Sequence, residues 1–478
     1  MTTLRPYQNQ AIDLMRTSIA EGKRRIILCA PTGSGKTVMF TFMVASALQR
    51  GKRCIIFTDR VELLKQSNGA LDLFGIKPTL IEAGKPRLDV SGNCFIAMAQ
   101  TYARRKNKAD YADLMAGMDL VIIDEAHKQT FNPLLASIPD KAVVIGATAT
   151  PLRRGNQECL SKFYQAIHNP VQVGELIRQG FLASPITYGT NIDLSGIGMR
   201  GNDYDTQQMA TVYSKRKVFD GVVQNYGRHC RGKKAIVFAS NIASSKEVCA
   251  ALHLAGHNAR HVDGDMGKQE RADVLEWFKH TPDAILCNCD LMTTGFDEPT
   301  IEVVILYRAT ASLPLFMQMV GRGSRVTPTK KEFTILDFGN NVNHHGFWEA
   351  NRDWSLKKKP KKKSAGVGGA KNCKGCEALI PVGAMVCPHC KYEYQRKPKE
   401  QGEIVDLHLM SKAEAMQVAK TSTMWQKAQL AKAKVISPYW VLHNHCKTKA
   451  EALEFIAFMG WKPGWAYHNK NRFKILQS

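Results

Sequence analysis

Short runs of consecutive apolar residues recur along the chain, and each is followed by a polar stretch with helical character. Continuous apolar runs suit strands buried on both faces, so they predict parallel sheets with crossover helices on each face. The runs form two groups, with a pause over residues 152–232. They are 24–30, 53–59, 94–100, 119–125 and 142–148, and then 234–240, 283–289 and 303–309. This pattern predicts an α/β fold of two similar units, with the break near residue 170.

The character of the chain changes after residue 350. The stretch KKKPKKKSAGVGGAK, which begins at Lys357, is a charge run followed by small residues, and it predicts a flexible basic linker. A cysteine cluster and a mostly helical tail follow. We therefore predict five parts, which are 1–169 and 170–350 for the two α/β units, 351–371 for the basic linker, 372–395 for a four-cysteine knuckle and 405–478 for a small, mainly helical C-terminal module.

Charge points to the partner of this chain. The 478 residues include 66 lysines and arginines against 42 acidic residues, for a net charge of +24. The last 128 residues hold 24 of the basic and 9 of the acidic residues. Such an excess indicates a polyanionic partner, although a merely solvated tail would carry the same charge.

Other features of the composition bear on location. We find no apolar run of about 18 residues, so we expect no membrane span. The stretch MTTLRPYQNQ lacks the order of a secretory signal, and nine of the 13 cysteines are scattered singly or in strand-like runs. A cytoplasmic protein is the expectation.

The stretch APTGSGKT (30–37) lies between a strand-like run and a plausible helix, the context that a phosphate-binding P-loop requires. Gly33 and Gly35 let the backbone turn its N–H groups toward phosphate oxygens, and Thr32 and Ser34 complete the loop. Lys36 adds positive charge near the β- and γ-phosphates, and the hydroxyl of Thr37 suits Mg²⁺. The strict pattern has glycine at position 30, where this chain has alanine.

A second candidate site follows in DLVIIDEAHK (119–128). A buried strand that ends in two carboxylates places Asp124 and Glu125 at the carboxyl edge of a sheet, where ligands bind in open α/β folds. Asp124 suits an outer-sphere partner of Mg²⁺, and Glu125 suits a group that orients and activates the attacking water. An ordinary acidic strand end is the structural alternative.

The stretch QMVGRGSR (318–325) presents two arginines three positions apart, and guanidinium forks suit phosphate oxygens. By themselves, the spacing and chemistry leave open whether Arg322 and Arg325 meet the P-loop phosphate, a nucleic-acid phosphate or a structural carboxylate.

Taken in order, APTGSGKT, DEAH, GATAT (146–150) and QMVGRGSR resemble the motifs of superfamily 2 helicases and translocases. The resemblance implies two RecA-like lobes with ATP and Mg²⁺ in the cleft between them. Arg322 and Arg325 would then reach the γ-phosphate from the second lobe when the cleft closes, with Gln318 in the same motif. Thr148 and Thr150 would couple the nucleotide state to lobe movement.

The same resemblance assigns further nucleotide contacts. LRPYQNQAI (4–12) resembles the adenine-reading segment, which assigns Gln8 to the base with Arg5 and Tyr7 as supports. In LMTTGFDEP (291–299), Gly295 and Asp297 would approach the ribose.

Nucleic-acid contacts are implied by four segments of the same kind. These are FTDRVELLKQ (57–66), whose Pro-Thr-Arg start is altered, AMAQT (97–101), IVFASNIASS (236–245) and LMTTGFDEP. The corresponding residues are Arg60, Gln100, Thr101, Ser240, Thr293 and Thr294.

Within superfamily 2, residues 1–356 most resemble bacterial and phage RadD-like helicases. The segments that carry this likeness include VGELIRQGFLASPITY, HVDGDM and LDFGNNVNHHG. The resemblance implies a DNA-dependent ATPase with roles in DNA repair, recombination or replication, with single-strand-binding or other repair proteins as candidate partners.

The cysteine cluster NCKGCEALIPVGAMVCPHC contains two CxxC pairs. Cys373, Cys376, Cys387 and Cys390 can supply four thiolates to a closed tetrahedral site, which suits structural Zn²⁺. The segment is too short for a hydrophobic core of its own, so metal would supply its folding energy. A redox dithiol would need only one pair.

Four of the seven tryptophans lie in the tail, and WKPGWAYHNKNRFK (461–474) interleaves aromatic and basic residues. Such a stretch suits the stacking of nucleobases beside phosphate contacts, but it equally suits the core of a small helical domain.

We therefore expect an ATP-driven helicase or translocase that acts on DNA, with RNA as the less favoured alternative substrate. Alternatives are a duplex translocase that does not separate strands, the motor subunit of a restriction system, and a binding platform whose affinity ATP switches. The tail holds no convincing nuclease cluster of carboxylates and lysine.

Overall fold

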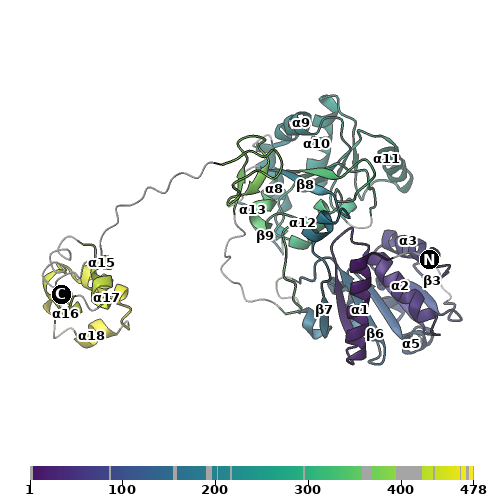
Figure 1. Cartoon of the computed structure of the whole chain (residues 1–478), viewed down its shortest axis with the longest axis horizontal. Coiled ribbons are helices and arrows are strands. Elements are labelled where there is room, and N and C mark those ends of the chain that lie inside the picture. The colour runs from purple at the N-terminus through teal and green to yellow at the C-terminus, as the bar shows by residue number, and fades with distance from the viewer. Residues whose placement is uncertain are drawn as a thin grey trace. The chain divides into compact units, whose positions relative to one another are not determined.

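The computed structural model describes residues 4–84, 88–153, 159–189, 196–201, 203–215, 218–293, 296–357, 369–394, 422–433, 436–462, 464–469 and 473–476. The chain forms two compact units, Met1–Gln395 and Arg396–Ser478 (Figure 1). The larger unit contains two parallel sheets and a small cysteine-containing hairpin.

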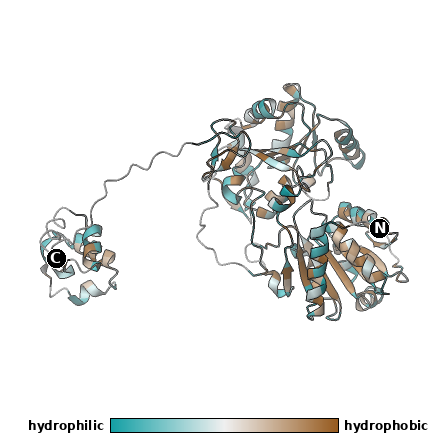
Figure 2. Cartoon of the chain, in the orientation of Figure 1, coloured by the Kyte–Doolittle hydropathy of each residue, from teal (hydrophilic) through white to brown (hydrophobic). Residues whose placement is uncertain are grey.

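The first sheet has seven parallel strands in the order β3-β4-β2-β5-β6-β1-β7. The strands are β1 (Arg25–Cys29), β2 (Cys54–Thr58), β3 (Thr79–Ile81), β4 (Cys94–Met98), β5 (Leu120–Asp124), β6 (Val143–Thr148) and β7 (Ala166–His168). The helices are α1 (Pro6–Ala20), α2 (Lys36–Leu48), α3 (Val61–Asp72), α4 (Ala99–Arg105), α5 (Ala109–Ala116) and α6 (Asn132–Leu135). Hydrophobic clusters lie on both faces, and the strands are among the most apolar segments of Figure 2. This sheet and its helices form lobe 1.

The second sheet has six parallel strands in the order β12-β13-β11-β14-β15-β8. The strands are β8 (Ser184–Gly189), β11 (Ala235–Ala239), β12 (Ala259–Val262), β13 (Ile285–Asn288), β14 (Val303–Tyr307) and β15 (Glu332–Asp337). The helices are α7 (Val173–Arg178), α8 (Thr206–Lys215), α9 (Val218–His229), α10 (Ile242–Leu254), α11 (Lys268–His280), α12 (Leu313–Val320) and α13 (Asn341–His345). With a hairpin of β9 (Met199–Arg200) and β10 (Asp203–Tyr204), these elements form lobe 2.

The predicted α/β fold with two parallel-sheet lobes is confirmed, and each of the eight apolar runs contains a strand. The pattern missed five strands of the two parallel sheets, and four of them, β3, β7, β8 and β12, lie at sheet edges. An edge strand has one neighbour and a partly exposed face, so its sequence keeps polar residues and lacks a continuous apolar run.

The parallel arrangement positions the candidate sites. The P-loop follows β1, the DEAH segment follows β5 and GATAT ends β6, so all three lie at the carboxyl edge of the first sheet. The QMVGRGSR segment spans the end of α12, which follows β14 at the carboxyl edge of the second sheet.

Residues 351–357, which open the predicted basic linker, pack against lobe 1. Trp354 and Leu356 lie against the hydrophobic cluster on one face of the first sheet, and the Ser161 N–H donates to the Leu356 carbonyl at 3.2 Å. Residues 358–368 lie outside the described residues.

The smaller unit is helical, as predicted. It contains α15 (Met424–Lys432), α16 (Pro438–Asn444), α17 (Lys449–Met459) and α18 (Trp465–Asn469) around its own hydrophobic cluster. Nowhere in the described part of the chain is a helix long and apolar enough to cross a membrane.

Candidate functional site

The P-loop adopts a conformation that depends on its glycines. Gly33 and Gly35 have φ angles of +83° and +80°, a left-handed region that residues with a Cβ rarely occupy. Gly35 caps α2, so the positive end of a 13-residue helix faces the loop.

Two side chains of the loop fit a phosphate ligand. The Ser34 hydroxyl is buried and has no hydrogen-bond partner among the described residues. The Lys36 ammonium donates to the carbonyls of Ala30 and Pro31, at 3.1 and 3.3 Å, so it stays at the loop itself. A buried hydroxyl and a charged amine beside free helical N–H groups are what an anionic phosphate requires.

The N-terminal segment is fastened to this loop. The Ser34 carbonyl accepts hydrogen bonds from Tyr7 Oη at 2.7 Å and from Gln8 Nε2 at 3.1 Å. A Cβ at Gly35 would lie 2.6 Å from Gln8 Nε2, so Gln8 rests on the glycine backbone. Arg5 stacks on Phe181 of lobe 2, with its guanidinium carbon 4.3 Å from the ring centroid. Three residues predicted to read or support the base therefore lie together at the P-loop and the lobe boundary.

Two adjacent carboxylates stand at the end of β5. Burial and the neighbouring Glu125 charge raise the pKa of Asp124 to about 7, and Lys36 opposes this shift. Glu125 has a φ angle of +54°, an uncommon conformation for a residue with a side chain. A cation between these groups would relieve the repulsion between the carboxylates, as expected for a magnesium site.

His127 connects this segment to GATAT. Its Nδ1 atom lies 2.8 Å from Thr148 Oγ1 and 3.3 Å from Glu125 Oε2. The Thr150 N–H donates to the same Thr148 hydroxyl at 3.1 Å. The sequence prediction named Thr148 and Thr150 but not the histidine that contacts Thr148, although the DEAH motif was available as a signal.

The QMVGRGSR segment of lobe 2 lies directly on the P-loop of lobe 1. A Cβ at Gly321 would lie 2.9 Å from Thr32 Cβ, and a Cβ at Gly33 would lie 2.8 Å from Leu182 Cδ2 and 3.5 Å from Ser324 Oγ. Segments about 290 residues apart in the sequence are thus in van der Waals contact.

The two arginines of this segment differ in their surroundings. Burial lowers the pKa of Arg322 to about 10, while the negative charge of Glu125 raises this pKa and the positive charge of Arg60 lowers it further. Arg322 therefore lies within electrostatic reach of the lobe 1 carboxylate, and it also donates to the Phe296 carbonyl. Arg325 forms an ion pair with Asp297 of its own lobe, and burial lowers its pKa to about 10.

The remaining predicted residues are divided between surface and core. Gln318 is buried in α12. Arg60 caps α3 and Thr101 lies in α4, both partly exposed, and the exposed Gln100 donates to the Asp59 carbonyl at 3.4 Å. Ser240 is buried, and its hydroxyl donates to Ser244 Oγ at 3.4 Å. Thr294, Gly295 and the Thr293 side chain lie outside the described residues.

Lys330 is a residue of this region that the sequence did not single out. Its buried ammonium donates to the Ile301 carbonyl at 2.6 Å and to the Gly323 carbonyl at 3.0 Å. Gly323 lies in the sequence between the two arginines. Burial lowers the pKa of Lys330 to about 8. A lysine in a polar stretch gives no sequence signal of such burial.

Known proteins share this architecture. Residues 1–153 match the family described as "Type III restriction enzyme, res subunit", and residues 215–327 match "Helicase conserved C-terminal domain". The chain belongs to helicase superfamily 2. The segments matched are the two lobes that meet at the P-loop.

Individual relatives of this superfamily 2 helicase are distant. A 51.5 kDa protein of a Lactococcus phage (isolate 7-9) is 29% identical over 78% of this chain and 79% of its own length. A Saccharomyces cerevisiae protein, provisionally named ATP-dependent helicase IRC3, is 28% identical over 70% of this chain and 51% of its own. The chain thus spans about half of the yeast relative.

A solved structure shares the fold. A fragment assigned to the HsdR subunit of a type I restriction enzyme from Vibrio vulnificus YJ016 aligns with a TM-score of 0.58 and 24% identity. The alignment covers 73% of this chain and 67% of that chain.

Beyond its lobes, the helicase has a four-cysteine cluster that could hold a metal ion. The Sγ atoms of Cys373, Cys376, Cys387 and Cys390 all lie within 4.8 Å of one another. Between the two CxxC pairs, the Sγ atoms of Cys373 and Cys390 lie 3.6 Å apart, and those of Cys376 and Cys387 lie 3.8 Å apart. A tetrahedral zinc site with Zn–S bonds of about 2.3 Å requires sulfur atoms roughly 3.8 Å apart, so the four thiols fit this metal.

The cysteine hairpin, β16 (Ala370–Asn372) with β17 (Leu379–Pro381), docks on lobe 2. Leu379 is part of the lobe 2 hydrophobic cluster, and a Cβ at Gly189 would lie 2.5 Å from its Cδ1 atom. An exposed ion pair between Arg228 and Glu377, at 2.9 Å, spans the same junction. The hairpin is therefore attached to lobe 2 by apolar packing.

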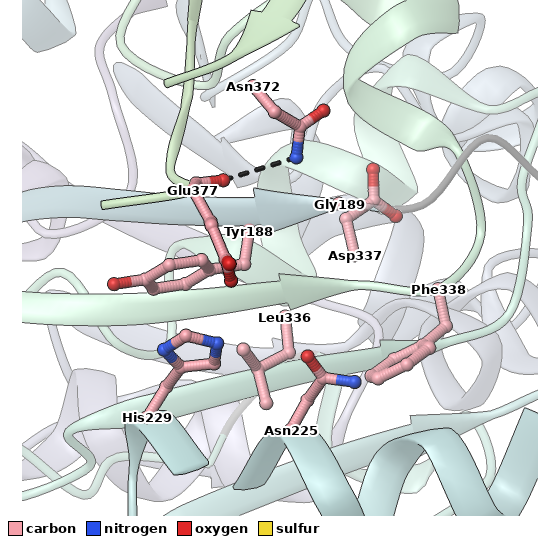
Figure 3. A pocket seen from close by; sticks show the side chains of 9 residues that line it. All are labelled: Tyr188, Gly189, Asn225, His229, Leu336, Asp337, Phe338, Asn372 and Glu377. Carbon is pink, nitrogen blue, oxygen red and sulfur yellow. Dashed lines mark hydrogen bonds between the residues drawn. The ribbon is translucent and has the colours of Figure 1, made fainter. Parts of the chain in front are cut away.

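A pocket of about 70 Å³ lies at this junction (Figure 3). The rings of Tyr188 and His229 stack there at 4.1 Å between centroids. The buried Asp337 accepts hydrogen bonds from Asn341 Nδ2 and the Val342 N–H, each at 2.8 Å. Because the Asp337 carboxylate already accepts these hydrogen bonds, we interpret the pocket as part of the packing between the hairpin and lobe 2.

Proposed function

We propose that this protein is an ATP-driven motor that moves along or remodels DNA. The observation that carries the proposal is the contact between lobes, where Gly321 rests on Thr32 and Arg322 lies within electrostatic reach of Glu125. An arginine brought by one lobe to the hydrolytic carboxylate of the other makes lobe closure depend on the triphosphate.

Residues of lobe 1 would bind and orient ATP. The P-loop N–H groups and Lys36 would bind the phosphates. Tyr7 and Gln8, which donate hydrogen bonds to the P-loop, would position it relative to the adenine base. Thr37 and Asp124 would hold Mg²⁺, which supplies positive charge to the phosphate oxygens. Glu125 orients the attacking water and accepts its proton.

Residues of lobe 2 would complete the site. Arg322 stabilises the negative charge that develops on the γ-phosphate, and its burial strengthens that interaction. Arg325 is held by Asp297 until nucleotide enters, and the ribose and γ-phosphate then separate this pair. Loss of the γ-phosphate would release lobe 2, which converts hydrolysis into movement.

DNA would cross the carboxyl edges of both sheets, beside Arg60, Gln100 and Thr101. The support is their position at the ends of β2 and β4, the same edge that carries the P-loop, and the net charge of +24. On this proposal the protein works in a bacterial cytoplasm, because the related 51.5 kDa protein belongs to a Lactococcus phage. The RadD-like assignment, and with it a role in repair, rests on the sequence motifs.

Structural Zn²⁺ is the metal proposed for the four cysteines. Backbone N–H groups support the thiolates, with Gly375 N 3.4 Å from Cys373 Sγ and Cys390 N 3.5 Å from Cys387 Sγ. Four thiolates leave no coordination position open for catalysis.

A restriction motor is the second candidate, favoured by the match of residues 1–153 to a restriction-enzyme family and by the HsdR-like fold. Such a motor would translocate on duplex DNA without separating its strands. Parallel unwinding and triplex-displacement assays discriminate between the two functions, because only a helicase releases a strand from a fork.

ATP turnover measured in parallel with single-stranded DNA, duplex, forked DNA and RNA tests the proposal. We expect DNA to stimulate turnover, and Lys36→Ala to abolish the stimulated rate. Lys23→Ala, which removes an exposed lysine of the same lobe, is the matched control and should behave as wild type. A Lys36→Ala protein that keeps DNA-stimulated hydrolysis, or a wild type that ignores every nucleic acid, would end the proposal.

A further inference from the structure

The C-terminal unit carries a connected group of aromatic rings, which we call the ring cluster: Tyr439, His443, Trp461, Trp465 and Phe473. The Trp461 and Trp465 centroids are 4.2 Å apart, and Tyr439 stacks on Phe473 at 5.9 Å with 4° between the ring planes. His443 and Trp465 also contact Phe473, at 4.8 and 5.9 Å. Residues from α16, α18 and the segments beside α18 thus form one aromatic patch.

Only the floor of this cluster is buried. Phe473 is 1% exposed, whereas Tyr439 is 44% exposed although its ring is stacked. Trp461 and Trp465 are partly buried and His443 is exposed. A ring that served only as core would lose its contact with water, so the open rings exceed what packing of this small unit requires.

The surrounding charge is strongly positive. Between Ser422 and Leu476 the sequence has nine lysines and arginines against two glutamates. Lys462 is exposed directly beside Trp461. Lys432 in α15, Lys449 in α17 and Lys447 just before α17 are exposed as well. An apolar protein partner would not select this charge, but a polyanion with aromatic faces would.

We propose that the ring cluster is a second nucleic-acid site, which stacks unpaired bases of single-stranded DNA while the lysines contact its phosphates. In a duplex the base faces are covered by neighbouring base pairs, whereas a single strand offers a face to each open ring. The site lies outside both helicase lobes and requires no nucleotide. It would hold a strand whether or not ATP is hydrolysed.

The test uses the full-length protein without nucleotide and a single-stranded oligodeoxynucleotide containing 5-bromodeoxyuridine. Light-induced crosslinks form where the base contacts an aromatic ring, and peptide mapping locates them. We expect crosslinks within residues 436–476, and competition by an unlabelled single strand but not by the matching duplex. An oligoribonucleotide in parallel distinguishes DNA from RNA as the source of the bases.

Variants at exposed positions identify the rings. Tyr439→Leu should lower the crosslink yield in this segment at least about five-fold, the lower end expected for one lost base–ring stack, whereas Tyr439→Phe should retain it. Trp425→Leu is the matched control, because Trp425 is 55% exposed in the same unit but has no ring neighbour among the described residues. Circular dichroism should confirm that the variants keep their helices.

Crosslinks confined to Met1–Gln395 would overturn the inference, and so would a Tyr439→Leu protein with the wild-type yield. Equal losses in Tyr439→Leu and Trp425→Leu would also contradict it, since they would show a general effect of aromatic surface. None of these outcomes depends on ATP turnover, so this proposal and the proposed motor can fail separately.

Discussion

The contact between Gly321 and Thr32 allows a sharp test of the closed ATP site. Gly321 has φ and ψ angles of −58° and −14°, which alanine adopts without strain. Gly321→Ala would nevertheless place a methyl carbon 2.9 Å from Thr32 Cβ and 3.0 Å from its Cγ2 atom. The substitution therefore inserts one carbon between the lobes, and the same carbon lies 3.0 Å from the Met317 carbonyl of lobe 2.

The size of the effect follows from these distances. Carbon atoms in favourable contact are about 3.5–4.0 Å apart, so the lobes must separate locally by roughly 0.6–1 Å. Thr32 is β-branched and part of the P-loop, so its side chain has little freedom to turn away. A misplacement of about 1 Å can cost about 100-fold in rate, or about 2.7 kcal/mol of activation free energy.

Steady-state ATP hydrolysis at saturating DNA measures this loss, and equilibrium binding of a nucleotide analogue measures ground-state affinity. We expect the turnover number to fall about 100-fold while nucleotide affinity changes much less, because lobe 1 alone holds the P-loop. Gly227→Ala in α9 is the control, since a Cβ there meets no atom within 4 Å. If Gly321→Ala remains folded and its turnover number stays within about two-fold of the wild-type value, the contact between the lobes plays no part in hydrolysis.

Three further predictions concern other parts of the structure. Lys330→Met should reduce ATP turnover at least about ten-fold and also lower the melting temperature, because the buried carbonyls of Ile301 and Gly323 lose their donor; an unchanged rate would exclude a positioning role for this lysine. Cys376→Ser, or removal of metal by a chelator, should destabilise lobe 2 by about 1.5–3 kcal/mol through loss of Leu379 burial, measured by denaturant unfolding alongside metal content; unaltered stability in metal-free protein would contradict the docking of the hairpin. Gly146→Ala should cost about 1–3 kcal/mol of unfolding free energy, because its methyl group would lie 2.6–2.8 Å from three side chains in the centre of lobe 1, and a neutral effect in thermal unfolding would show that this core can expand.

Local sequence was sufficient for the framework of this protein. Central strands of a parallel sheet are buried on both faces, so their continuous apolar runs marked eight strands directly. The P-loop and the strand-end carboxylates could be predicted because their chemistry depends on residues adjacent in the chain. The four thiols were found for the same reason, since two CxxC pairs bring their ligands together over a short loop.

Tertiary structure decided what depends on residues far apart. Spacing alone left both arginines with several candidate anions, and only the fold brings Arg322 toward Glu125 while Arg325 pairs with Asp297. The buried position of Ser240 was equally invisible, because a serine after an apolar strand can face either way. The local pattern of apolar and polar residues predicts which residues are buried. It does not predict which residues meet across the lobes, because that depends on how two separate hydrophobic cores pack against each other.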